Sequence, residues 1–122
     1  MGIFICMKII ITEKQELTLD FFINQQKNVF KEDSYILEWS LKNHLDNHNM
    51  MKDVINYDED GAVDRIIDRV YGDWLYKSNY QGYDGINKEI LKDMYSDRIR
   101  RKYRFLRKKN KHIVDAFENR LK

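Results

Sequence analysis

The fold depends on residues 86–121, which read INKEILKDMYSDRIRRKYRFLRKKNKHIVDAFENRL. Apolar residues recur there at steps of four, three, seven and four: Ile99, Tyr103, Leu106, Ile113 and Phe117. This is the heptad spacing of a helix that buries one edge. Asn110 stands in the gap, where a polar residue can fix the register of a coiled coil. The stretch predicts one long amphipathic helix.

Positive charge surrounds this apolar edge. Residues 98–114 contain nine of the 22 lysines and arginines of the chain and none of its 20 acids. Such blocks of like charge often bind polyanions or acidic protein surfaces. An aromatic ring among them could also stack on a nucleic-acid base. The candidate binding residues are Arg98, Arg100, Arg101, Arg104, Phe105, Arg107, Lys108 and Lys111.

The end of the same helix predicts a second contact. At 1.5 Å per residue the helix would be about 54 Å long, which exceeds the diameter of a domain of this size. We therefore expect its end to project and to dock a protein partner or a second copy through Ile113, Phe117 and Leu121. The alternative is a helix whose cations are only solvated and complement its own dipole.

Composition favours a mainly α protein with a single domain over residues 1–122. Apolar residues make up 43% of the chain, proline is absent, and glycine occurs five times, too rarely for the turns of a β-sandwich. The single cysteine, Cys6, excludes an intrachain disulfide. No apolar run reaches the length of a membrane span, so we expect no membrane contact.

The remaining elements follow from caps and periodicity. Residues 3–11 are β-branched and predict a short strand, paired with residues 54–57 or with another chain. Thr12 would cap a first helix to about residue 30, and Asp33 or Ser34 a second to about residue 48. A third helix is predicted over residues 62–76, with Arg65–Asp68 and Arg69–Asp73 as pairs on its surface. The prediction is therefore four helices, a short N-terminal strand, and a long basic C-terminal helix.

Two motifs resemble metal sites but lack essential ligands. His44 and His48 lie one helical turn apart, yet Leu45 stands where a zincin has its catalytic glutamate. Residues 56–61 follow the start of a calcium loop, but Ile67 occupies the position of the bidentate glutamate. We therefore expect no metal, no cofactor, no small-molecule substrate and no enzymatic activity.

The segment MKIIITEKQ, residues 7–15, resembles the first residues of many small proteins of tailed bacteriophages, and Met7 could be the translation start. The resemblance implies a phage-encoded accessory or particle-associated protein, located in the bacterial cytoplasm or in the virion. The function that we expect is binding and assembly. The alternatives are a regulator that binds nucleic acid without sequence specificity and a small metal-dependent hydrolase using His44 and His48.

Overall fold

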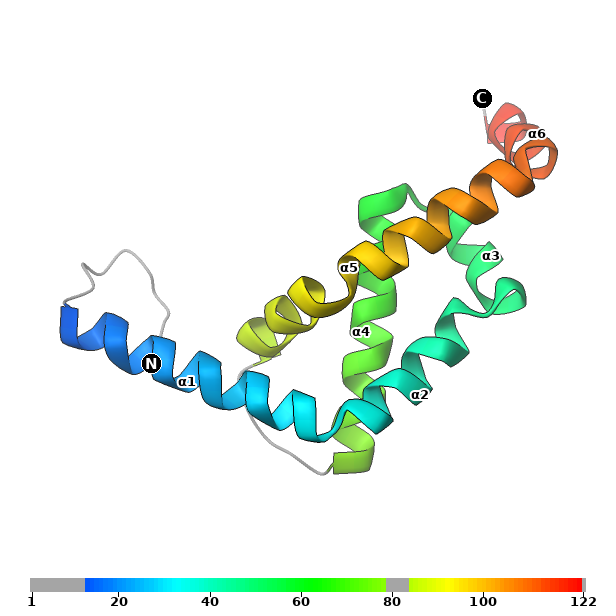
Figure 1. Ribbon diagram of the computed structural model, residues 1–122. Helices are drawn as coiled ribbons and strands as arrows, with labels where there is room; N and C mark the ends of the chain where they lie inside the picture. Colours follow the sequence, from blue (N-terminus) through cyan, green and yellow to red (C-terminus); the bar gives the residue numbers. More distant parts are fainter. Residues whose placement is uncertain (1–12, 79–83, 122) are drawn as a thin grey trace.

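The computed structural model describes residues 13–78 and 84–121, and all regular structure within these ranges is helical (Figure 1). The described helices are α1 (Glu13–Glu32), α2 (Ser34–Leu45), α3 (Asn47–Asn56), α4 (Glu59–Ser78), α5 (Asp84–Lys109) and α6 (Lys111–Leu121). The mainly α prediction is confirmed. The strand expected over residues 3–11 and the cap expected at Thr12 lie outside the described residues. Of the described helices, none is both long and apolar enough to cross a bilayer.

Helix α4 runs through the middle of the molecule and carries much of the core (Figure 1). It packs chiefly against α2 and α5. Trp74 is fully buried, and its ring lies edge-on to that of Phe30, with the ring centroids 4.8 Å apart. Its Nε1 donates a hydrogen bond to the carboxylate of Asp33 at 2.9 Å. The helix predicted over residues 62–76 is thus confirmed, and its apolar stripe is buried: Val63, Ile66, Ile67, Val70 and Trp74.

The prediction of a single helix over residues 34–48 is wrong, because the chain turns at Asp46. The backbone of Asp46 is extended, with φ −54° and ψ 138°, and its carboxylate accepts the backbone N–H of His48 at 2.9 Å. Asp46 is therefore the N-cap of a new helix, α3. Residues 54–56, expected to be extended, lie in that helix, and Val54 is buried. The cap outweighed the apolar periodicity that suggested one continuous helix.

The prediction of one unbroken helix over residues 86–121 is also wrong, because α5 and α6 meet at Asn110. The Nδ2 of Asn110 donates to the carbonyl of Leu106 at 3.0 Å and lies 3.5 Å from Sδ of Met51 in α3. Helix α6 then packs against α3 instead of continuing outward. The turn shifts the buried face by one residue, so Val114 is buried and Ile113 is 41% exposed.

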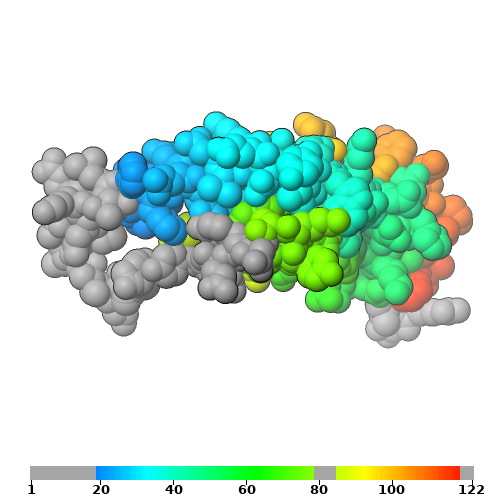
Figure 2. All heavy atoms as spheres, turned by 90° about the horizontal axis from the view of Figure 1, so that it is seen from below, coloured from blue at the N-terminus to red at the C-terminus, as the bar shows by residue number. Residues whose placement is uncertain are grey.

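The molecule is elongated, with α1 at one end and with α3 and α6 gathered at the other (Figure 2). Ile99, Tyr103 and Leu106 are all buried, which confirms the first part of the predicted apolar edge. Because that edge faces α4 and α3, the opposite side of α5 is left for solvent or ligands.

Candidate anion-binding face

The arginines on one side of α5 are bound by acids from the start of α4. Glu59 accepts hydrogen bonds from Arg100 at 2.8 Å and from Arg104 at 2.7 and 2.8 Å. Arg100 also reaches Asp60 at 2.7 Å. The hydrogen bonds from Arg104 and then Arg100 lower the pKa of Glu59 below its ordinary value. These contacts fasten α5 to the first turn of α4.

Three further candidate cations are also in ion pairs. Arg98 donates to both oxygens of Glu38 in α2, at 2.7 and 2.9 Å. Arg107 pairs with Glu118 at 3.1 Å, and Lys111 with Asp115 one turn away in α6. Residues 98–114 contain no acid, but the fold brings acids to them from α2, α4 and α6. The sequence could not show this pairing, because the partners of Arg98, Arg100 and Arg104 are more than 40 positions away.

The cations without an acidic partner lie on the side of α5 that also carries the paired Arg98. Its members lie within an arc of about 120° on a helix that turns 100° per residue. Lys42 of α2 is exposed and lines a hollow together with Arg101, Lys102 and Phe105. Within the described ranges none of these cations has an ion-pair partner. We call the resulting surface the outer face, and it consists of Lys42, Arg101, Lys102, Phe105, Lys108 and Lys109.

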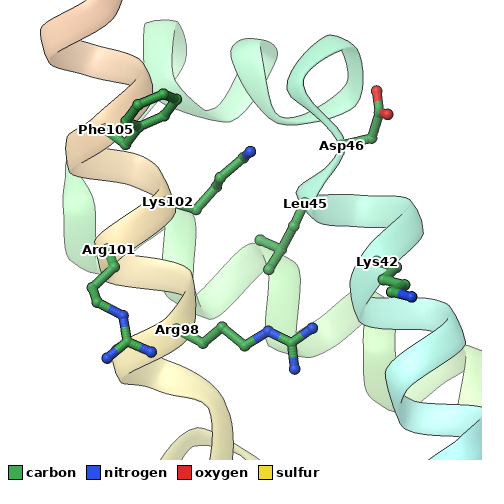
Figure 3. Close-up of a pocket in the computed structure, with 7 residues that line it drawn as sticks. All are labelled: Lys42, Leu45, Asp46, Arg98, Arg101, Lys102 and Phe105. Atoms are coloured by element: carbon green, nitrogen blue, oxygen red, sulfur yellow. The ribbon is translucent and has the colours of Figure 1, made fainter.

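A hollow of about 550 Å³ lies between this side of α5 and the end of α2 (Figure 3). Arg98 and Lys102 extend from α5 toward α2, while Phe105 and Leu45 contribute apolar walls. Asp46 is the one acid that lines it, against four cations. The hollow is therefore cationic and widely open to solvent. Its lining residues are Lys42, Leu45, Asp46, Arg98, Arg101, Lys102 and Phe105.

Phe105 is the apolar centre of the outer face. Its side chain is 54% exposed, and Nζ of Lys102 and Lys109 lie 5.6 and 5.7 Å from the ring centroid. Ammonium groups at this distance are attracted to an aromatic ring. The ring thus holds two flexible cations near itself without neutralising either, and both can still contact an anion.

A second hollow, of about 490 Å³, forms where α6 turns away from α5. It is lined by Arg104, Arg107, Lys108, Lys111, Val114 and Asp115. Three of its four cations are in ion pairs, with Glu59, Glu118 and Asp115. It is a weaker candidate for anion binding than the hollow beside Phe105.

The two histidines considered as metal ligands lie in different helices, because the chain turns at Asp46. His44 Nε2 is 3.1 Å from Oδ2 of Asp73, and Ser40 donates to the same oxygen at 2.6 Å. A serine hydrolase needs the histidine between the serine and the acid, whereas here the acid is between the other two. Ser40 is also fully buried, so its hydroxyl is closed to a substrate.

The acids of the calcium-like segment have other contacts. Asp58 accepts the backbone N–H of Gly61 at 2.7 Å. Asp64, which would stand at position 9 of a calcium loop, pairs with Lys92 at 2.9 Å. Helix α4 begins at Glu59, so the loop geometry of a calcium site is not formed. Among the described residues, no group of three histidines, cysteines or acids could hold a metal ion.

The predicted docking residues do not form a projecting tip. Ile113 is 41% exposed and Phe117 is half-buried, both on α6 beside α3. The side chain of Leu121 lies outside the described part of the structure.

Comparisons with models of protein families, with curated proteins and with solved structures found no match to this chain.

Proposed function

We propose that this chain is a non-catalytic binding protein whose outer face contacts the phosphate backbone of nucleic acid without reading its sequence. One observation carries the proposal: four cations of one arc of α5, and Lys42 of α2 in the hollow beside that arc, have no ion-pair partner among the described residues. The five are Lys42, Arg101, Lys102, Lys108 and Lys109. The paired arginines, by contrast, stabilise the fold and are less available to a ligand.

Counterion release makes such binding depend on salt. Five cations that neutralise about five phosphates give a slope of log K against log salt of about −4.5 on duplex DNA. Four of the five are lysines, whose flexible ammonium groups act as point charges and do not recognise base edges bidentately. We therefore expect tight binding at low salt and little discrimination between sequences.

The experiment is a titration of fluorescein-labelled oligonucleotides by fluorescence anisotropy at several salt concentrations. The test variant replaces Arg101, Lys108 and Lys109 with Gln, and all three side chains are exposed. The matched control replaces Lys27, Lys31 and Lys52, exposed lysines of α1 and α3, so both variants lose three charges. The first variant should weaken binding strongly and reduce the slope by about three. Equal binding by the two variants, or no binding by the natural chain, would refute the proposal.

A second candidate function is docking of a protein partner through α6, within a phage accessory or assembly role. An apolar side chain, Ile113, stays 41% exposed there beside the half-buried Phe117. Sedimentation velocity over a hundredfold concentration range tests self-association. Ile113→Ser should shift the chain toward the monomer if α6 joins two copies, and an unchanged monomer at every concentration would reject that role.

We do not propose the metal-dependent hydrolase, because His44 is bound to Asp73 and separated from His48 by the turn at Asp46.

A further inference from the structure

We infer that the ligand of the outer face is single-stranded nucleic acid, with one unpaired base stacked on the ring of Phe105. This inference rests on the function proposed above and narrows it to one class of nucleic acid. Charge alone would accept any polyanion, so the argument depends on the aromatic ring and its surroundings.

Phe105 is exposed at a place where the fold does not need it. The buried positions of α5 nearest to it are Ile99, Tyr103 and Leu106, on another side of the helix. Phe105 instead forms a wall of the hollow between α5 and α2, with 54% of its side chain exposed (Figure 3). A large apolar ring exposed within a cationic surface is a suitable platform for a flat, apolar surface of a ligand.

The cations around the ring can contact the phosphates on either side of a base once that base displaces an ammonium group from the face of the ring. Lys102 and Lys109 lie one turn before and one turn after Phe105, with Nζ within 6 Å of the ring centroid. Arg101 lies on the other flank of the same arc of α5, and Lys42 of α2 lines the same hollow. A base on the ring would therefore have cations on several sides within reach of its backbone.

The ring distinguishes a single strand from a duplex. In a duplex each base is stacked between its neighbours, so its flat faces are covered, and an exposed phenyl group gains nothing from it. An unpaired base offers a free face, and stacking on aromatic side chains tolerates every base. The hollow of about 550 Å³ leaves room for a nucleotide beside the ring. These features favour single strands without favouring a sequence.

The test compares three fluorescein-labelled ligands of equal phosphate number: a fifteen-residue oligothymidine, an abasic strand with the same backbone, and a duplex. We expect the natural chain to bind oligothymidine about tenfold more tightly than the abasic strand. The slope of log K against log salt on oligothymidine should be about −3.5, since single strands release fewer counterions per contact.

Substitutions at Phe105 distinguish aromatic stacking from general hydrophobic contact. Phe105→Leu keeps an apolar side chain but has no ring, so it should lose about tenfold on oligothymidine and nothing on the abasic strand. Phe105→Trp keeps an aromatic ring, so its affinity for oligothymidine should equal that of the natural chain. The fluorescence of the new indole should be quenched by oligothymidine. Phe21→Leu is the control, because Phe21 is 62% exposed and belongs to α1, outside the outer face. Thermal unfolding followed by circular dichroism checks that each variant is folded.

The possible results of these titrations distinguish base stacking on Phe105 from binding to the phosphate backbone alone. Equal affinity for oligothymidine, abasic strand and duplex, together with an unchanged Phe105→Leu variant, would overturn the single-strand inference and leave backbone binding intact. Absence of binding to all three ligands at low salt would overturn both. Tighter binding to the duplex would also overturn the inference, because its bases are closed to the ring.

Discussion

Glu59 lies at the first turn of α4 and bonds two arginines of α5 with its two carboxylate oxygens. It is 24% exposed, so water weakens but does not abolish its contacts. Acids at this position also suit the positive end of the helix dipole. Glu59 thus neutralises two arginines, Arg100 and Arg104, that would otherwise be free to bind an anionic ligand.

Glu59→Gln should lower the free energy of unfolding at pH 7 by about 1 kcal/mol, because two charge-assisted contacts become weak neutral ones. The pKa of Glu59 is lower in the folded chain than its ordinary value of 4.5. Its contribution is therefore complete above pH 4.5 and is lost as the pH falls through the folded-state pKa. Urea unfolding at several pH values should show the difference between natural chain and variant shrinking in acid. Asp93→Asn, at an exposed position of α5, is the control.

The Asp53–Arg69 pair predicts a larger effect. Asp53 is 1% exposed and accepts two hydrogen bonds from Arg69, at 2.8 and 3.0 Å, and the bond to Asp53 raises the pKa of Arg69. Arg69→Met should cost about 3 kcal/mol, since it leaves a buried carboxylate without its partner. Adding Asp53→Leu should recover much of that loss. A double variant as unstable as the sum of the two single ones, by urea unfolding, would contradict this reasoning.

Residue types were easier to predict from the sequence than partners. Phe105 is exposed among the cations of residues 98–111, a run that the sequence alone identifies. The expected pairs Arg65–Asp68 and Arg69–Asp73 are replaced by ion pairs between helices. Asp68 pairs with Lys88 of α5, and Arg69 pairs with Asp53 of α3. Spacing along one helix shows which residues can meet within it, but only tertiary packing shows which acid from another helix is nearer.

At the scale of elements, both errors about helix length have the same cause. The helices predicted over residues 34–48 and 86–121 end early at Asp46 and Asn110, which are neither glycine nor proline. Each bonds the backbone with its side chain, and such bonds compete with the helix. Apolar periodicity continues across both sites, so it could not reveal the turns. The stripe of α4 has no such residue inside it, and its helix was predicted correctly.

Helix α6 gives a prediction at this scale. Its main buried anchor among the described side chains is Val114, which is 2% exposed. Val114→Asp places a charge in that contact, so α6 should detach from α3 while α4 stays protected. Hydrogen exchange followed by mass spectrometry should show amides of α6 exchanging at least tenfold faster. His112→Asp, at an exposed neighbouring position with the same added carboxylate, should leave α6 protected. Equal acceleration in α4 would mean that α6 does not open separately.

At the scale of the whole molecule, α4 joins the other helices into one core. It packs against α2, α3 and α5, and Trp74 near its end also meets Phe30 of α1. Among the described helices, the core is therefore continuous through α4. Cooperative unfolding is the expectation for a domain of this size.

Trp74→Phe should lower the free energy of unfolding by about 2–3 kcal/mol, through lost volume and a lost donor to Asp33. Its transition should have the same midpoint by circular dichroism and by the fluorescence of Trp39, which is 47% exposed. Trp39→Phe, the control, should change stability by less than about 0.5 kcal/mol. Two separate midpoints in the Trp74→Phe variant would show that the core unfolds in parts.

The division of α5 into a paired side and an outer side has a consequence for protein engineering. Arg100 and Arg104 keep the helix docked through Glu59, while Arg101 and Lys102 on the outer side carry no ion pair among the described residues. Glutamates at positions 42, 101 and 102 would therefore invert the sign of the surface while the scaffold beneath stays assembled. Substitutions on one arc of α5 and at one position of α2 would thus change the preferred ligand of this scaffold from one rich in phosphate to one rich in amines.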